Sequence, residues 1–298
     1  MLFLFVKKVY NVCGDFMHGF LLIDKPIGMT SHDVVYKVKR KLQVDKIGHT
    51  GTLDPFASGL LILCVGKATK LQSLFLNLDK VYEGTILLGK HYDTYDYTGK
   101  VVEQKEVKID DNQLANAIKD MNKTYAQTPP MYSAIKVQGR KLYNLARQGQ
   151  TVDVEPRLVS IYDFHMTSSL KEDSFDFYAY VSKGTYIRSL AVDLATSLGT
   201  YGALSRLRRL SIGTYHVDSA KQIEKVSSED LITLEVFFSN VPSITLSDYL
   251  CKLIKNGVYL DERQIITDEP FIVKDNQGQY VAYYEVVKEN TYRPVIIF

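Results

Sequence analysis

The chain has 298 residues, of which 46% are hydrophobic and 23% charged, and its formal net charge is +2 at pH 7. This length predicts about two domains, and this composition excludes a disordered or low-complexity chain. No run reaches the ~18 apolar residues of a membrane span, so we expect no membrane segment. Cys13, Cys64 and Cys251 lie far apart without a C-x-x-C pair, which argues against a disulfide framework and a zinc knuckle. We therefore expect a cytoplasmic protein.

The first sixty residues change from an aperiodic start to recognisable strand, helix and loop patterns. Residues 1–16 show no periodicity, and we expect a dispensable extension before a fold that begins at Met17. Residues 19–24 predict a buried strand, and a helix should follow with Ser31 as its N-cap. The segment 48–59 holds three glycines and a proline and must therefore be a loop.

The rest of the chain alternates irregularly between strand and helix patterns. Apolar periodicity predicts strands over 60–65, 81–88 and 175–181, and helices over 67–78, 111–121 and 187–198. A capped helix is also expected near Ser227, and Pro242 marks a boundary before a tail of short strands. This order predicts the α+β class, with a mixed sheet domain over 17–240 and a small β-rich domain over 241–298.

Several common chemistries have no support in the sequence. Neither G-x-G-x-x-G nor a Walker A loop occurs, which disfavours dinucleotide and P-loop sites. His91, Asp93 and Asp96 lie close together, but such polar clusters after a strand are typical of turns rather than metal sites. Ser133-Ala-Ile-Lys136 matches the S-x-x-K pattern of acyl-serine enzymes, although no K-T-G follows it. Labelling of Ser133 by a serine-directed inhibitor would revive that alternative.

The loop over 48–59 contains the most suggestive carboxylate. Asp54 lies between Leu53 and Pro55, and a proline restricts the residue before it to extended conformations. An acid held on a stiff loop beside apolar neighbours suits covalent or acid/base chemistry. An aspartate that merely caps a turn remains the alternative from spacing alone.

Longer motifs indicate a family. DKPIGMTSHDVV (24–35) and GHTGTLDPFASGLL (48–61) strongly resemble the TruB family of tRNA pseudouridine-55 synthases. Further matches follow in order: VYEGTILLG (81–89), QTPPMYSAIKVQGRKLYNLAR (127–147), KGTYIRSL (183–190) and LRRLSIG (207–213). The resemblance covers about 18–215 and implies the pseudouridine synthase fold, a largely antiparallel sheet flanked by helices. The tail resembles the small PUA-like RNA-binding domain of bacterial members.

The resemblance also implies a reaction. Family members isomerise one T-loop uridine of tRNA to pseudouridine on an extruded nucleotide, without metal or other cofactor. By the D-P pair of its motif, Asp54 corresponds to the catalytic carboxylate, and Arg188 of the G-T-Y-I-R motif corresponds to its cationic partner. Tyr82 matches the tyrosine on which the extruded base stacks, and it is also a candidate general base.

The substrate contacts are expected by the same resemblance. His49 matches the residue that fills the gap left by the extruded base, and Tyr186 and Leu207 match residues that line the pocket. An insertion over about 124–152, with Lys136 among its cations, should grip the T-loop. Arg209, in a cluster of arginines over 206–209, should contact phosphate. The expected partner is the T-arm of tRNA, with a monomer that needs no obligate protein partner.

Three alternatives remain open at this point. The chain could be a tRNA-folding chaperone whose catalysis is incidental, or a pseudouridine synthase with a different RNA target. A guide-RNA-dependent relative is disfavoured by the short tail and by the lack of an extended basic terminus. The tail holds eight acidic and six basic residues, so its electrostatic contribution to RNA binding is doubtful.

Overall fold

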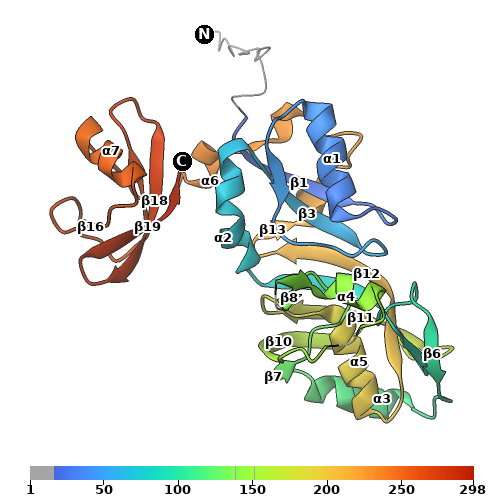
Figure 1. Cartoon of the computed structure of the whole chain (residues 1–298). Coiled ribbons are helices and arrows are strands. Elements are labelled where there is room, and N and C mark those ends of the chain that lie inside the picture. The colour runs from blue at the N-terminus through green and yellow to red at the C-terminus, as the bar shows by residue number, and fades with distance from the viewer. Residues whose placement is uncertain (1–16, 138, 151) are drawn as a thin grey trace, which may run out of the picture.

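The computed structural model describes residues 17–137, 139–150 and 152–298, so the expected extension over 1–16 lies outside the described residues (Figure 1). A ten-stranded sheet and a five-stranded sheet dominate the fold. None of the helices in these ranges is long and apolar enough to cross a membrane.

The large sheet has the order β14-β1-β3-β12-β4-β11-β10-β7, with β2 beside β3 and β13 beside β12. Its only parallel pair among the described strands is β3 with β12, which confirms a mixed, largely antiparallel sheet. The strands are β1 (Gly19–Lys25), β2 (Ile47–His49), β3 (Ser58–Val65), β4 (Lys80–Leu88), β7 (Thr124–Gln127), β10 (Arg157–Met166), β11 (Ser174–Val181), β12 (Gly202–Ile212), β13 (Tyr215–His216) and β14 (Ile232–Thr233).

This part of the chain also contains helices and 3₁₀ turns. They are α1 (Ser31–Leu42), α2 (Gln72–Leu76), α3 (Asp111–Asp120), α4 (Leu142–Arg147), α5 (Ile187–Ser197) and α6 (Leu234–Phe237), with 3₁₀ turns η2 (Gly66–Leu71), η3 (Val217–Ser219) and η4 (Ser228–Asp230). Two hairpins project from it, β5 (Lys90–Tyr92) with β6 (Val101–Gln104), and β8 (Lys136–Val137) with β9 (Arg140–Lys141).

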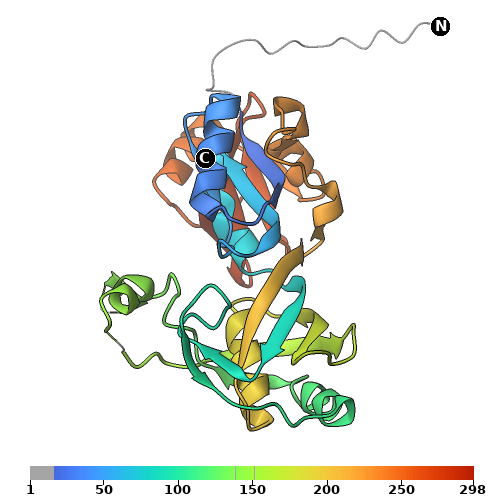
Figure 2. The same cartoon turned by 90° about the vertical axis from the view of Figure 1, so that its right-hand side faces the viewer.

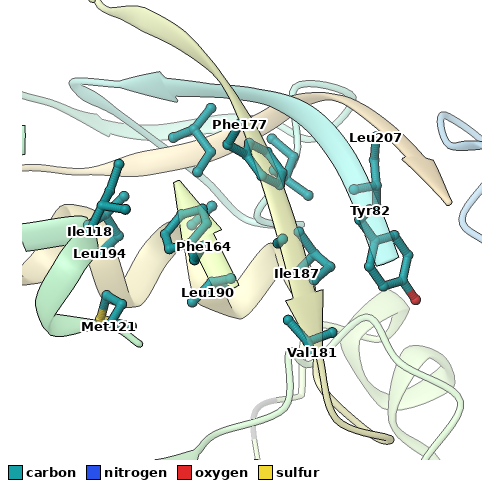
Figure 3. Packing of buried hydrophobic residues seen from close by; sticks show 14 of the residues in the cluster. Tyr82, Ile118, Met121, Phe164, Phe177, Val181, Ile187, Leu190, Leu194 and Leu207 are labelled. Atoms are coloured by element: carbon teal, nitrogen blue, oxygen red, sulfur yellow. The ribbon is translucent and has the colours of Figure 1, made fainter. Parts of the chain in front are cut away.

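The half of the sheet formed by β4, β11 and β10 is closed by α3 and α5. Alternate residues of β4 and β11 are buried, as the period of two predicts for a sheet with one covered face. Their inward side chains pack against both helices in one apolar cluster (Figure 3). The other half, formed by β1 and β3, packs α1 through Val34 and Val38. The sheet is therefore covered by α3 and α5 in one half and by α1 in the other.

The small sheet is formed by β15 (Ser243–Thr245), β17 (Phe271–Lys274), β18 (Tyr280–Lys288), β19 (Thr291–Ile297) and β16 (Leu260–Asp261), with α7 (Asp248–Lys255) packed on it. A second cluster connects this sheet to the large one, because Phe20 and Ile62 share buried contacts with Ile272 and Tyr283. Figure 2 shows the same arrangement turned by 90°, with this sheet behind the N-terminal part of the chain. The two parts thus share apolar core rather than a polar linker alone.

Three local expectations were wrong. Thr30, not Ser31, is the N-cap of α1, because the Thr30 hydroxyl and the Asp33 carboxylate form a reciprocal capping box. The helix expected over 67–78 is a 3₁₀ turn followed by a short α2, and the helix expected near Ser227 is only a 3₁₀ turn. Strand β10 and the central strand β12 have no counterpart among the strands that periodicity predicts.

Strand β12 escaped detection for a physical reason. Its register shifts between Leu204 and Arg206 and again between Arg209 and Ser211. Each such bulge inserts a residue and breaks the alternation of buried and exposed side chains. The arginines of this strand therefore looked like a charge cluster rather than a strand in the centre of a sheet.

Candidate active site

Asp54 lies in the turn between β2 and β3, with its side chain 31% accessible to solvent. Its neighbours Leu53 and Phe56 are buried in the cluster beneath α5. The backbone N–H of Ala57 donates to the Asp54 carbonyl at 3.1 Å, which closes the turn around Pro55. The carboxylate is therefore fixed beside apolar core and still open to an incoming molecule.

Arg188 holds this carboxylate with two N–H groups. Its Nε lies 2.9 Å from Asp54 Oδ2, and its Nη2 donates to Asp54 Oδ1 at 3.1 Å. The guanidinium also donates to the carbonyls of Thr94 and Tyr132, both at 2.8 Å. Because its side chain is only 6% exposed and it is the second residue of α5, this cation is rigidly placed. A planar fork on a carboxylate fixes orientation as well as charge.

The protonation of Asp54 reflects two opposed effects. Burial raises the pKa of its carboxyl group above the ordinary value, and the Arg188 guanidinium opposes this rise. Asp96, whose Oδ2 lies 3.8 Å from Arg188 Nη1, raises the pKa further. The arginine is thus the main contact that favours the ionised form of this carboxylate.

A second buried cation, Lys25 at the end of β1, was not expected from the sequence. Its side chain is fully buried, and its Nζ donates to the carbonyls of Pro26 at 3.0 Å and Met29 at 2.6 Å. Burial lowers its pKa to about 8, and the nearby charge of Asp54 opposes this shift. Its only sequence signal was its place in the D-K-P motif.

The Asp54 turn is anchored to the preceding elements by hydrogen bonds. The Ser31 hydroxyl donates to the Leu53 carbonyl at 3.2 Å and accepts from the Leu53 N–H at 2.9 Å. The Gly28 N–H donates to the Pro55 carbonyl at 2.8 Å. Ser31 is thus a loop-anchoring residue at the first position of α1, a role that the N-cap interpretation missed.

The arginines of β12 are occupied by the protein itself. Arg209 is 2% exposed and donates to the carbonyls of Leu60 at 2.8 Å and Gly51 at 3.4 Å. Arg208 forms a two-point ion pair with Asp24, and Arg206 pairs with two carboxylates. The expected phosphate cluster over 206–209 is therefore wrong as a free cationic surface, since Arg209 is buried and Arg206 and Arg208 are paired with carboxylates.

Close approach of β3 to β12 explains how Arg209 reaches the turn. Gly59 has φ +103° and pairs with Arg209, and a Cβ at Gly59 would lie 2.3 Å from the Arg209 carbonyl oxygen. Only glycine tolerates both this conformation and this contact. The glycine of the motif therefore brings the arginine beneath the backbone of the Asp54 turn.

Tyr82 and Leu207 lie together at one end of the cluster under α5, beside Ile187 (Figure 3). They are 8% and 5% exposed, and the Tyr82 hydroxyl points away from the cluster in this view. Tyr186 immediately precedes α5 as its N-cap, two residues before Arg188. Burial raises the pKa of its phenol. The structure therefore gathers these three expected pocket residues around the start of α5.

His49 ends β2, on the strand that leads into the Asp54 turn. Its ring meets that of His32 edge-on, with centroids 5.4 Å apart, and its Nδ1 is buried with no hydrogen-bond partner among the described residues. Burial, with smaller contributions from His32 and Arg209, lowers its pKa to about 4. At neutral pH this imidazole is uncharged, as suits contact with bases rather than phosphates.

The segment over 128–150 carries the remaining expected cation, Lys136. Its backbone begins β8, but its side chain lies outside the described residues. Arg140 and Arg147 are exposed on the same segment. Arg147 lies over the Tyr143 ring at 5.6 Å. Exposed cations therefore remain available here, unlike on β12.

Two alternative sites were considered from the sequence, the S-x-x-K motif that begins at Ser133 and the polar cluster over 91–96. Ser133 is 5% exposed, and its hydroxyl lies near the Tyr186 phenol: burial raises the pKa of that phenol and Ser133 opposes the rise. His91 lies in β5, and Asp93 and Asp96 accept hydrogen bonds from the backbone N–H groups of Lys100 and Thr98 in the following turn. In the described ranges no group of three His, Cys, Asp or Glu residues could hold a metal ion.

Comparison with known families gives a direct match. The family described as TruB family pseudouridylate synthase (N terminal domain) matches residues 39–187, half of this chain. Asp54 and Tyr82 lie within this match, and Arg188 is the first residue beyond it.

Related proteins cover almost the whole chain. A tRNA pseudouridine synthase B from Aster yellows witches'-broom phytoplasma (strain AYWB) is 54% identical over 283 residues, 95% of this chain and 100% of the relative. One from Acholeplasma laidlawii is 51% identical over 90% of this chain and 95% of its own length. One from Aquifex aeolicus is 39% identical over 86% and 94%.

Solved structures agree at the level of fold. A chain in the crystal structure of the archaeal box H/ACA sRNP Nop10-Cbf5 complex aligns with a TM-score of 0.65 at 19% identity, covering 95% of this chain and 86% of that one. A chain of a Cbf5-Nop10-Gar1 complex gives the same TM-score at 20% identity, covering 95% and 84%. With the family model and these relatives in agreement, this chain belongs to the TruB family of pseudouridylate synthases.

Proposed function

We propose that this chain isomerises the uridine at position 55, in the T-loop of tRNA, to pseudouridine, with Asp54 as the catalytic carboxylate. The observation that carries this proposal is the Asp54–Arg188 pair, in which a two-point contact fixes a carboxylate that keeps 31% of its side chain accessible. The family and the names of its relatives support the reaction class and a tRNA substrate.

The reaction needs an ionised carboxylate at the sugar–base junction. The C1′–N1 bond breaks, the uracil turns, a C1′–C5 bond forms, N1 gains a proton and C5 loses one. Attack at C1′, attack at C6 and support of a glycal intermediate differ in which atom meets Asp54. All three require an ionised carboxylate. The buried Arg188 favours this form, because it opposes the effect of burial on the pKa of Asp54.

The target nucleotide must leave the stacked loop, at a cost of a few kcal/mol. Stacking on an aromatic ring returns about 1–3 kcal/mol per base. Tyr82, with Leu207 and Ile187 beside it, offers such a surface next to the start of α5. We assign stacking to Tyr82, so Tyr82→Phe should keep most activity, whereas a collapse would show that the hydroxyl transfers the C5 proton.

The neutral imidazole of His49 is assigned to the gap that the extruded uridine leaves. RNA affinity comes from the segment over 124–152, with Lys136 among its cations, and from the small sheet over 243–297, whose region is net acidic and contributes mainly by shape. The chain acts as a cytoplasmic monomer without an obligate protein partner.

The test uses the purified full chain alone with an unmodified tRNA transcript, followed by mapping of pseudouridine at single-nucleotide resolution. We expect one modified site, at position 55, and none in a transcript with cytidine there. Modification elsewhere, or a requirement for an added guide RNA, would overturn the assignment. Refolding of denatured tRNA by Asp54→Asn would show that a chaperone activity coexists with catalysis.

A further inference from the structure

A chain of partly buried hydrogen bonds connects the edge strand β7 to helix α5. The Tyr186 N–H donates to Gln127 Oε1 at 2.8 Å, and Gln127 Nε2 donates to the Tyr125 hydroxyl at 2.8 Å. The Tyr125 hydroxyl donates in turn to Asp193 Oδ2 at 2.7 Å. Gln127 is 2% exposed, so its amide depends on these protein partners.

The direction of every bond in this chain follows from one backbone group. An N–H can only donate, so the Tyr186 N–H requires the oxygen of the Gln127 amide, and this orients the amide. The amide nitrogen must then donate to Tyr125, whose single proton is left for Asp193. Asp193 must therefore accept. Its pKa is raised by burial, and the hydrogen bonds from Tyr125 and Gln127 oppose this rise.

These hydrogen bonds attach α5 at two positions along its length. Tyr186 is the N-cap of α5 and lacks a side-chain cap of its own, so Gln127 supplies an acceptor at the helix start. Asp193 lies seven residues further along, about two turns or ~10 Å. The Ser189 hydroxyl adds a bond to the Thr128 carbonyl at 2.7 Å. Two attachment points along one helix fix both its translation and its rotation.

Arg188 lies between these attachment points. A rotation or slide of α5 would move its guanidinium away from Asp54, and misplacement by ~1 Å can cost about 100-fold in rate. We propose that Gln127, Tyr125 and Asp193 form a polarised positioning relay that sets the register of α5, and thereby of Arg188, for catalysis. This inference rests on the proposed function, and none of the three residues need touch substrate.

The polarity of the relay gives a sharp test. Gln127→Glu keeps the acceptor for the Tyr186 N–H but loses the donor to Tyr125 and places two carboxylates around one hydroxyl. Asp193→Asn keeps an acceptor for Tyr125. In the double variant Gln127→Glu with Asp193→Asn, the asparagine amide donates to Tyr125 and the tyrosine donates to Glu. The series of hydrogen bonds is then complete again, with the Tyr125 hydroxyl donating toward position 127 rather than toward position 193. It contains one carboxylate, as in wild type.

The experiment measures the single-turnover rate of pseudouridine formation and the Kd for a T-arm RNA hairpin, using full-length variants. We expect Gln127→Glu and Tyr125→Phe to lower the rate about tenfold or more with Kd within a few fold of wild type. Asp193→Asn should stay close to wild type, and the double variant should recover most of the rate lost in Gln127→Glu. Tyr162→Phe, an exposed tyrosine on β10, is the matched control.

Each outcome decides the inference separately from the proposed function. Absence of pseudouridine with wild type would refute the function itself. An active wild type with Gln127→Glu as fast as Tyr162→Phe would overturn the relay. So would a double variant no faster than Gln127→Glu, because a packing role predicts additive losses rather than rescue. Thermal unfolding of each variant checks that a slow enzyme is a folded one.

Discussion

The two sides of the site are built differently. The turn that carries Asp54 is tied to its surroundings by the Ser31 hydroxyl, the Gly28 N–H and the buried Arg209 guanidinium. Across the site, the segment over 128–150 carries exposed side chains on a short hairpin and α4. Ser189 and Arg188 of α5 donate hydrogen bonds to the carbonyls of Thr128 and Tyr132 in this segment.

This difference matches two physical demands. Electrostatic catalysis depends on charges that are already in place, because reorganisation during the reaction costs rate. Recognition of a folded RNA loop depends on shape and on splayed bases, which a lightly attached segment can follow. Substitutions on the turn side should therefore lower the rate constant, whereas substitutions on the opposite side should weaken binding.

The largest expected effect comes from Asp54→Asn. Removing the anion should reduce turnover about 10⁴-fold or more, as when a nucleophile is removed from other enzymes, while affinity for a T-arm hairpin changes little. Single-turnover assays on protein free of wild-type contamination, with gel-shift titration, measure the two quantities. Near-normal product yield would contradict the carboxylate assignment.

The same variant tests the electrostatics of the turn. The folded-state pKa of Asp54 lies above its ordinary value, so the charged form costs folding free energy at every pH above that raised pKa. Asparagine removes this cost, and the melting temperature of Asp54→Asn at neutral pH should equal or exceed that of wild type. A marked fall in melting temperature would mean that the pair stabilises the fold.

Arg188→Lys should have the next largest effect. A lysine keeps the charge but not the fork that contacts Asp54 at two points, so we expect about a 100-fold loss of rate. Burial raises the pKa of Asp54 and the hydrogen bonds from the guanidinium help to oppose this rise, so their loss should also move the acidic limb of the pH–rate profile to higher pH. An unshifted limb would separate positioning by Arg188 from its electrostatic role.

Two neighbouring residues at the start of α1, Thr30 and Ser31, should differ in their effects on activity and stability. Ser31→Ala removes both hydrogen bonds to Leu53 and should lower the rate about tenfold without changing RNA affinity, since the turn loses its anchor. Thr30→Ala removes only the exposed capping box and should cost about 0.5–2 kcal/mol of stability with normal activity below the melting range. Equal activity of the two variants would refute the anchoring role of Ser31.

Sequence alone predicted more of the fold's parts than of their arrangement. The strands β4 and β11 follow from their alternation, since each residue's burial repeats with the pleat. The bulged β12 does not, although it joins β3 to β4 at the centre of the sheet. Bulges and pairing between distant strands are set by tertiary packing, which local periodicity does not encode.

The candidate site shows the same limit. Motif resemblance singled out Asp54 and Arg188, and the structure brings them within hydrogen-bond distance across 134 positions of sequence. It did not distinguish an arginine that is free to bind phosphate from one that is buried, as Arg209 is. Lys25 and Ser31 were equally hidden, because their partners are backbone groups with no signature in the sequence.

The smallest expected effect tests the RNA-gripping side. Arg147 is exposed on α4, whereas Arg206 is paired with Glu83 and Asp176 on the sheet. If Arg147 neutralises one phosphate, Arg147→Ala should weaken T-arm binding several-fold and reduce the slope of log K against log salt by about 0.7–0.9. Arg206→Ala should leave that slope unchanged, because its charge is already balanced by two carboxylates. Equal slopes for both variants would mean that the phosphate contacts lie elsewhere. The segment over 128–150 would then not be the RNA-binding counterpart of the catalytic Asp54 turn.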